Sequence, residues 1–331
     1  MSATPKNKPI VATSIGEPAG IGAEVVAKAW AGGEVHKLGR PVVIGSVRVM
    51  EMGVEFAKVR AKVRKIASLD ELGDSPEVID ILDSGALDPK DLHIGKDTIA
   101  GGLASMQWMD QANDLAKSGK AGASVFAPIS TGSLKMAGKL DSVININPGE
   151  TYLFLVSGPL RIMHLTDHIP LRRVSDLITE DLMFSALQTL DTTMRKWGIA
   201  KPRISVAGFN PHAQGDEESK QMAPAVKRAQ AAGINAAGPD SPDAVFRQCI
   251  EDRYDVVLAM YHDQGHIPIK TWGFAGNCAI VVGLPYLSMS VAHGTAFDIV
   301  GKGIADHSMM QSAMCTAGSL AAGKGFIKEA A

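Results

Sequence analysis

Three histidines in this sequence each follow a short apolar run and could together hold a metal ion. Out of nine histidines in the chain, they are His168 in TDHIP, His212 in NPHAQ and His262 in YHDQG. Neutral imidazole is the commonest protein ligand for a divalent transition metal, and three ligands from separate loops leave positions open for a substrate. We therefore expect one catalytic divalent metal ion at these residues, with zinc as the first choice. Taken singly, each histidine is better explained as a turn cap or as the partner of a nearby acid.

Ionisable side chains that accompany these histidines are candidates for proton transfer. Asp263, His266 and Lys270 follow His262 within a few residues, and Asp243 lies between the second and third histidine. A nearby divalent cation disfavours the charged form of a lysine, so Lys270 would act as a base or proton donor near neutral pH. Asp263 and Asp243 would orient an imidazole or balance the metal charge. The alternatives are a solvated surface lysine and two ordinary helix caps.

Two glycine-rich segments suggest how a nucleotide would be held. The segment HGTAFDIVGKGIAD, at residues 293–306, has the composition of a cofactor loop. An acid such as Asp298 accepts hydrogen bonds from an adenosine ribose and repels a 2′-phosphate, which favours NAD over NADP. The other segment, IGEPAGIG at residues 15–22, is not a G-x-G-x-x-G motif, and its Pro18 removes an amide donor. It is either an anion-binding turn at a helix start or a simple tight turn.

The elements that must position these residues alternate between two kinds. Short runs rich in Val and Ile predict buried strands at residues 9–14, 41–46, 122–128, 160–166, 203–208 and 255–261. Helix-like stretches lie between them, at residues 21–31, 102–118, 179–197 and 219–232. This alternation predicts an α/β layered fold with a largely parallel or mixed sheet. Ligands bind beyond the carboxyl ends of such strands, so we expect the site in the polar loops at residues 14–22, 167–170, 210–216 and 262–270.

Length and composition exclude several classes of protein. A chain of 331 residues exceeds the size at which one core keeps growing, so two domains are expected. The net charge of -2, with both signs interspersed, provides no field for nucleic acid. Three cysteines are too few for a disulfide framework, which favours a cytoplasmic protein. No signal peptide or membrane-spanning run is visible, so no membrane partner is expected.

Four motifs, EPAGIG, NPHA, YHDQG followed by P-x-K, and HGTAFDI, closely resemble the 4-hydroxythreonine-4-phosphate dehydrogenase (PdxA) family, in order and over nearly the whole chain. The resemblance implies a fold similar to isocitrate and isopropylmalate dehydrogenases, with two α/β/α lobes and a central cleft, and not a Rossmann fold. It also implies a homodimer whose active site the partner subunit completes. We expect a first lobe from residues 1–130 plus 305–331. The second, residues 131–304, should carry most metal, substrate and NAD residues and the dimer contacts.

The resemblance also assigns individual residues. It places the metal triad on His168, His212 and His262, a substrate-contacting lysine on Lys270 and an acid beside the site on Asp243. Together with Asp263, the last two are the expected catalytic residues. The expected NAD contacts in the glycine-rich loop are His293, Gly294, Thr295, Asp298 and Asp306.

Four positions depart from the members of the family that handle phosphate. By motif alignment, Glu150-Thr151 replaces a His-Thr pair and Ser288 replaces an arginine. Ala279 replaces an asparagine, and Thr131 replaces a lysine. Three of the changes remove a potential cation or add an acid, and a buried phosphate needs charge-assisted donors worth roughly 1.5 to 3 kcal/mol each. We infer a substrate without phosphate, contacted by Glu150, Thr151, Ala279, Ser288 and His266.

One branch resembling this family oxidises the cis-dihydrodiol of terephthalate and shares the string HDQGHIPIK, including His266. We therefore expect an NAD-dependent, metal-dependent oxidation of a hydroxyl near a carboxylate, followed by decarboxylation, on a substrate such as a terephthalate-type cis-dihydrodiol. One alternative is a dehydrogenase for 4-hydroxythreonine 4-phosphate or for 4-phospho-threonate or 4-phospho-erythronate. More distant alternatives are a metal-dependent hydrolase or lyase and a catalytically silent homologue that binds small carboxylates.

Overall fold

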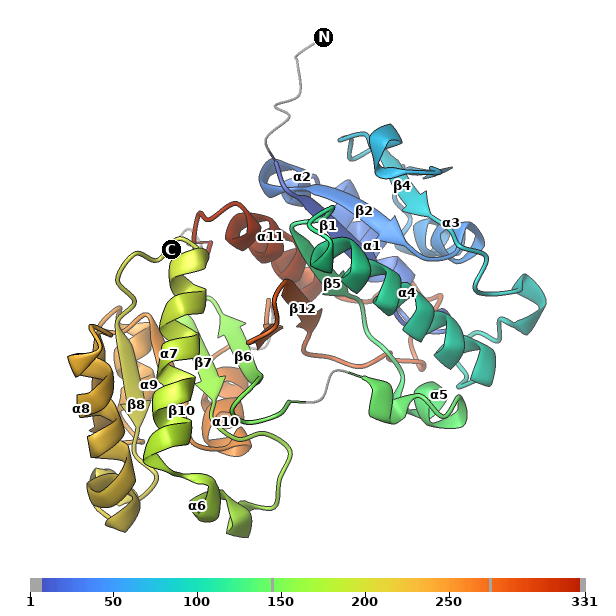
Figure 1. The fold of residues 1–331 in the computed structure, drawn as a ribbon. Coiled ribbons are helices and arrows are strands. Elements are labelled where there is room, and N and C mark those ends of the chain that lie inside the picture. The colour runs from blue at the N-terminus through green and yellow to red at the C-terminus, as the bar shows by residue number, and fades with distance from the viewer. Residues whose placement is uncertain (1–7, 144–145, 274–275, 328–331) are drawn as a thin grey trace. The chain divides into compact units, whose positions relative to one another are not determined.

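The computed structural model describes residues 8–143, 146–273 and 276–327, and it divides the chain into two compact units (Figure 1). The first comprises Met1–Asn145 and Pro285–Ala322, and the second comprises Ile146–Leu284 and Gly323–Ala331. The boundaries differ from those expected from the sequence, because the last strand and the segment 293–306 fold into the first unit. No helix in the described part of the chain is long and apolar enough to cross a bilayer.

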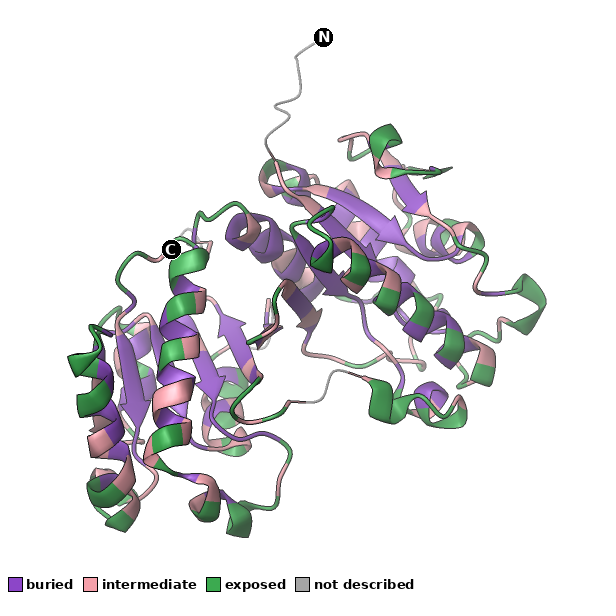
Figure 2. Ribbon diagram, viewed as in Figure 1, coloured by how far each residue is buried: buried purple, intermediate pink, exposed green. Residues whose placement is uncertain are grey.

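The first unit is built on six parallel strands in the order β3-β4-β2-β1-β5-β12. Their bounds are β1 (Ile10–Ser14), β2 (Arg40–Ile44), β3 (Lys62–Lys65), β4 (Val78–Leu82), β5 (Ala123–Phe126) and β12 (Leu287–Val291). The central strands are buried along most of their length, as Figure 2 shows. Continuous burial is expected in parallel sheets, whose two faces are both covered by helices.

The first unit also contains helices and short 3₁₀ turns, some of which cover the sheet. They are α1 (Gly22–Ala31), α2 (Glu34–Leu38), α3 (Val47–Ala57), α4 (Ile99–Lys117), α5 (Thr131–Met136), α11 (Ser308–Ala321), η1 (Leu69–Glu71), η2 (Pro89–Asp91) and η3 (Leu140–Ser142). Helix α4 packs on β1 and β5, whereas α11 packs on β12 and β5 together with α1 and α2. The hydroxyl of Thr98 accepts the N–H of Gly101 at 2.9 Å, which caps the start of α4.

The second unit contains a mixed sheet in the order β11-β6-β7-β10-β8-β9. Its strands are β6 (Tyr152–Ser157), β7 (Leu160–His164), β8 (Ile204–Ala207), β9 (Ala236–Asp240), β10 (Val256–Ala259) and β11 (Cys278–Val282). The pairs β11-β6 and β6-β7 are antiparallel, and the pairs from β7 to β9 are parallel. Its core includes the fully buried side chains of Leu160, Ile162 and Val257. The α/β fold class expected from the sequence is therefore confirmed.

The helices of the second unit are α6 (Val174–Leu177), α7 (Glu180–Lys196), α8 (Ala223–Ala231), α9 (Val245–Ile250) and α10 (His262–Trp272), with 3₁₀ turns η4 (Leu171–Arg173) and η5 (Pro211–Ala213) and the π-helical turn η6 (Glu218–Met222).

Helix α10 corrects the expectation of a polar loop at residues 262–270. Gly265 and Pro268 disfavour a helix, but Gly265 and Ile269 are buried and α10 packs against β7. Tertiary burial therefore outweighs the weak local propensity.

Candidate metal centre and cofactor loop

Four neighbouring strands of the second unit are each followed by a candidate residue. The strands β7, β10, β8 and β9 run parallel in this order. Asp167 and His168 follow β7, His262 follows β10, His212 follows β8 and Asp243 follows β9. The carboxyl ends of parallel strands meet at one edge of a sheet, which is where α/β sheets bind ligands. The topology thus brings residues that are distant in sequence to one edge.

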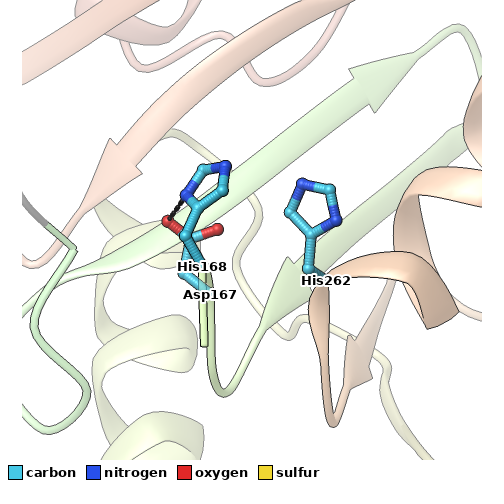
Figure 3. Close-up of side chains that lie close together, drawn as sticks. All are labelled: Asp167, His168 and His262. Atoms are coloured by element: carbon cyan, nitrogen blue, oxygen red, sulfur yellow. Dashed lines mark hydrogen bonds and ion pairs between the residues drawn. The ribbon is translucent and has the colours of Figure 1, made fainter. Parts of the chain in front are cut away.

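His168 and His262 lie together beside Asp167, as Figure 3 shows. One ligand atom from each of the three residues lies within 4.8 Å of the others. Nδ1 of His168 donates to Oδ2 of Asp167 at 2.9 Å, and Nδ1 of His262 donates to Oδ1 of Asp263 at 2.7 Å. A carboxylate bound at Nδ1 fixes the tautomer that presents Nε2 as a free lone pair. The donor set therefore fits a divalent transition metal.

Asp167 was not among the residues expected from the sequence. Its Oδ1 is buried and has no hydrogen-bond partner, whereas its Oδ2 holds His168. The signal that could have identified it is local, because TDH and HDQ each place an acid beside a histidine. Asp167 can thus orient His168, and its second oxygen can also serve as a metal ligand.

The third expected ligand, His212, lies outside this group. Among the residues that the structure describes, the compact group consists of Asp167, His168 and His262. His212 instead lines a pocket of about 710 Å³ together with Asp243 and Asp263. Its φ of 56° is left-handed, a conformation that non-glycine residues rarely adopt and that is often found at functional sites. His212 thus lies on the side of α10 that carries Asp263.

Glu218 holds the loop that carries His212. Its Oε1 accepts the backbone N–H groups of Phe209 and Asn210, each at 2.7 Å, and its Oε2 accepts Nδ2 of Asn210 at 2.8 Å. The side chain of Glu218 is buried at the start of the π-helical turn η6. The polar segment after NPHA therefore fixes the backbone next to His212.

Two further histidines extend inward from His262. The ring of His266 stacks on that of His262 with centroids 3.6 Å apart, and the ring of His164 lies 4.9 Å from that of His266. Nδ1 of His266 donates to the carbonyl of His262 at 3.0 Å, and Nδ1 of His164 donates to the carbonyl of Leu153 at 3.1 Å. Burial lowers the pKa of His164 to about 3 and that of His266 to about 4. Both imidazoles are therefore neutral at pH 7.

The expected catalytic residues lie around the same helix. Lys270 is exposed near the end of α10. The hydrogen bond from His262 lowers the pKa of Asp263, and the charge of Lys270 adds to this lowering. The pKa of Asp243 is lowered by a hydrogen bond from Ser241, with a smaller contribution from His212. Lys270 thus interacts electrostatically with Asp263, the partner of His262, and Asp243 interacts with His212.

The positions expected to contact substrate are distributed over both units. Glu150 and Thr151 form the turn before β6, where Oγ1 of Thr151 accepts the N–H of Asn147 at 2.9 Å. Ala279 lies in β11 and packs against the core of the second unit. Ser288 lies in β12 of the first unit, where it is 1% exposed. Their roles as substrate contacts stay predictions.

The segment 293–306 follows β12 in the first unit. Nδ1 of His293 lies 2.9 Å from the carbonyl of Gly294, and its Nε2 is buried without a partner. Asp306 accepts the N–H of Ser308 at 2.9 Å, which lowers the pKa of Asp306 with smaller contributions from nearby histidines. Gly294 and Asp298 are exposed. An unpartnered imidazole nitrogen, an open glycine and an exposed acid fit the polar groups of a nucleotide.

The segment 15–22 is a tight turn whose amides are already used. The N–H of Gly20 donates to the carbonyl of Glu17 at 3.1 Å, and the N–H of Ala19 donates to Oε1 of Glu17 at 3.2 Å. The N–H of Ile21 donates to the carbonyl of Thr295 at 3.1 Å. Of the two interpretations left open by the sequence, the geometry favours the tight turn over the anion site.

Comparisons with known proteins agree with the motifs. A family model described as pyridoxal phosphate biosynthetic protein PdxA matches residues 37–317. A provisionally named 4-hydroxythreonine-4-phosphate dehydrogenase of Novosphingobium aromaticivorans is 53% identical over 325 residues, which is 98% of each chain. A provisionally named D-threonate 4-phosphate dehydrogenase of Clostridium botulinum is 35% identical, over 94% of this chain and 96% of that protein.

A solved structure shows the same relationship. The 4-hydroxythreonine-4-phosphate dehydrogenase of Klebsiella pneumoniae is 35% identical to this chain, with a TM-score of 0.83. The match covers 95% of this chain and 99% of that one. The resemblance inferred from four motifs is thereby confirmed, and the chain belongs to the PdxA family.

Proposed function

We propose that this protein oxidises a hydroxyl group of a 4-phosphorylated hydroxy acid, of the class of 4-hydroxythreonine 4-phosphate and 4-phospho-threonate. NAD would be the hydride acceptor, and one divalent metal ion, zinc in the first instance, would be required. One observation carries the proposal. His168 and His262 present free Nε2 atoms, each fixed by its own carboxylate, in a chain 53% identical over 325 residues to a provisionally named dehydrogenase for such a substrate.

This proposal corrects the expectation of a non-phosphorylated, terephthalate-type cis-dihydrodiol. The terephthalate 1,2-cis-dihydrodiol dehydrogenase of Burkholderia xenovorans is 27% identical with a TM-score of 0.65, over 91% of this chain and 95% of that one. The Klebsiella enzyme is 35% identical to this chain with a TM-score of 0.83. Both relatives named for phosphorylated acids are at least 35% identical to this chain. The shared string HDQGHIPIK therefore does not identify the branch.

The sequence argument failed because it treated a few positions as the only means of binding phosphate. It counted the cations missing at Glu150, Ser288 and Thr131 as a loss of phosphate affinity. Backbone amides and cations at other positions also bind phosphate. The loss of individual cations thus changes how phosphate is held without excluding it.

Residues of the second unit would bind the metal, orient its ligands and accept the proton. Nε2 of His168 and Nε2 of His262 would hold the metal, with Asp167 or His212 completing the set. A divalent cation there would lower the pKa of a bound hydroxyl and stabilise negative charge on its oxygen. Asp167 and Asp263 keep both imidazoles in the required tautomer. Lys270 would take up the hydroxyl proton.

The cofactor contacts we propose lie in the first unit. They are His293, Gly294, Thr295, Asp298 and Asp306. NAD would remove the hydride from the carbon that carries the hydroxyl. The exposed carboxylate of Asp298 matches the ribose hydroxyls of NAD and repels the 2′-phosphate of NADP. A ketone formed next to a carboxylate-bearing carbon loses carbon dioxide readily, so we propose that decarboxylation follows oxidation.

We also propose a homodimer whose partner subunit completes the active site, with the arrangement of an isocitrate or isopropylmalate dehydrogenase. Ile267 and Trp272 on α10 support this, because these large apolar side chains are 65% and 48% exposed in the single chain. Analytical ultracentrifugation tests the dimer. A monomer at micromolar concentration would contradict it.

The proposed activity is tested by following NAD reduction with chelated protein and added zinc. The substrates are 4-hydroxythreonine 4-phosphate and 4-phospho-D-threonate, each compared with its counterpart without phosphate. We expect NADH to form only with the metal present and with strong preference for the phosphorylated acids. No NADH with any phosphorylated acid would overturn the proposal. Product formation without NADH would instead indicate a hydrolase or lyase.

A further inference from the structure

Two charged side chains of α1 lie largely within the first unit, with Glu24 buried and Lys28 partly buried. They are 1% and 15% exposed, and Nζ of Lys28 lies 2.7 Å from Oε1 of Glu24. Helical ion pairs at this spacing usually lie on the surface, where they contribute little stability. Burying both charges is costly unless the charged atoms gain further hydrogen bonds. The position of this pair therefore needs an explanation beyond helix stability.

The backbone at the end of the segment 293–306 provides that explanation. Nζ of Lys28 donates to the carbonyl of Gly303 at 3.1 Å and to the carbonyl of Ala305 at 2.8 Å. Oε1 of Glu24 accepts the N–H of Ala305 at 3.1 Å. Together with the ion pair, these contacts use all three donors of the ammonium group. The N–H and the carbonyl of Ala305 are thus both held by one turn of α1.

The turn before α1 anchors the same segment at its other end. The N–H of Ile21 donates to the carbonyl of Thr295 at 3.1 Å. A Cβ placed on Gly20 would lie 3.0 Å from Cβ and from the carbonyl oxygen of Thr295, so any larger residue would push the segment away. Between the two anchors lies Asp298, and directly after the second lies Asp306. Residues 20–28 therefore hold the segment 293–306 at Thr295 and again at Gly303 and Ala305.

We propose that Glu24 and Lys28 are positioning residues for the cofactor, which fix the backbone at Ala305 and thereby set the affinity for NAD. The inference rests on the proposed function, which assigns the segment 293–306 to NAD. Neither side chain needs to touch the cofactor, because both act through the Ala305 peptide. A loop that is ordered before binding loses less conformational entropy when the ligand arrives. Zinc affinity should not depend on the pair, because His168 and His262 belong to the second unit.

The main variant is the double substitution Glu24→Leu with Lys28→Met. It removes both charges while keeping apolar volume, so that no unpaired charge is left buried. A second variant, Lys28→Met alone, keeps the contact between Glu24 and Ala305 and serves if the double variant does not fold. The matched control is Glu34→Leu with Lys37→Met, which removes an ion pair on α2 whose side chains are 51% and 69% exposed.

Three measurements on the zinc-loaded protein test the inference: the Kd for NAD by calorimetry, the Kd for zinc by chelator competition, and hydrogen exchange over residues 293–306. We expect the double variant to weaken NAD binding about ten-fold and to speed exchange in this segment, as an unanchored loop must be ordered on binding. Lys28→Met should do so to a smaller extent. The Kd for zinc should stay at its wild-type value in these variants. The control variant should keep the wild-type Kd for NAD and the wild-type exchange rates.

The possible outcomes distinguish a failure of this inference from a failure of the proposed function. Wild-type affinity for NAD in a folded double variant, or in Lys28→Met if that is the one that folds, would overturn the inference. A parallel loss of zinc affinity would also overturn it, because the pair would then act on the whole fold. Wild-type protein that binds no NAD would overturn the proposed function, and the inference with it. Titration of the wild type therefore tells the two failures apart.

Discussion

The imidazole of His266 lies flat on that of His262, with planes 14° from parallel and centroids 3.6 Å apart. The two residues are one helical turn apart on α10, so their side chains lie on the same face. Because Nδ1 of His266 also bonds to the carbonyl of His262, the stacked ring is itself held in place. The contact restricts the rotation of a side chain that we expect to bind metal.

Removing this stacked ring should weaken metal binding. His266→Ala is expected to raise the Kd for zinc about two- to ten-fold, since a stacked aromatic pair contributes about 0.5 to 1.5 kcal/mol. His266→Phe keeps a flat ring and should stay close to wild type. Chelator competition gives the Kd, and the visible spectrum of bound Co²⁺ reports the coordination. Equal losses in both variants would mean that His266 acts through its nitrogen and not through stacking.

Substituting the carboxylates that hold the histidines should also weaken metal binding. Asp167→Asn and Asp263→Asn are each expected to cost about 10- to 100-fold in zinc affinity, because the carboxylate fixes the tautomer and raises the basicity of the imidazole. The matched control is Asp216→Asn, in a surface ion pair with Lys220 whose acid is 80% exposed. Unchanged zinc affinity in the Asp167 variant would remove this residue from the candidate centre.

His212 offers a separate test, because its backbone is left-handed. Asparagine tolerates this conformation better than most residues, so His212→Asn removes the imidazole with little backbone strain. If His212 is the third ligand, zinc affinity should fall at least as far as in Asp167→Asn, and NAD reduction should be lost. Normal zinc binding and turnover in a folded His212→Asn protein would show that the centre needs only the group of Asp167, His168 and His262.

The inner histidines should make stability depend on pH. Folding lowers the pKa of His164 to about 3 and that of His266 to about 4, from 6.5. Between these values the unfolded chain binds more protons than the folded one, so the free energy of unfolding of metal-free protein should fall as the pH drops below about 6.5. The fully buried His164 contributes up to about 1.4 kcal/mol per pH unit. Urea unfolding near pH 7 and near pH 5 should show a smaller difference for His164→Leu, and equal differences would assign the effect to other groups.

Strands rich in buried apolar residues could be predicted closely. Residues 9–14 and 160–166 were expected as strands and form β1 (Ile10–Ser14) and β7 (Leu160–His164). Both are buried at four of their five residues, and their apolar residues indicate them. Helix α10 could not be predicted, because Gly265 and Pro268 disfavour a helix locally and burial against β7 decides the outcome. Strand β12 was missed because its alternating serines hide a strand that is completed by distant partners.

The sequence predicted those parts of the candidate site that follow from the order of strands and helices along the chain. Parallel strands place His168 and His262 at one edge, and this arrangement follows from the alternation of strands and helices. The contribution of Asp167 depends on the turn after β7, whose direction the sequence does not indicate. The contact between the rings of His164 and His266 joins β7 to α10, so it depends on tertiary structure that single-sequence patterns do not contain.

The pairing of β12 with β5 joins two strands that the ribosome synthesises far apart in time. Ser124 in β5 and Leu287 in β12 are neighbours although they lie 163 positions apart. A nascent chain therefore carries β5 with one side unpaired while all of residues 146–284 are being synthesised. Unpaired strand edges favour association with other chains, and such exposure during synthesis is a common cause of aggregation. Strand β12 thus closes an edge of β5 that stays open for the whole synthesis of the second unit's strands.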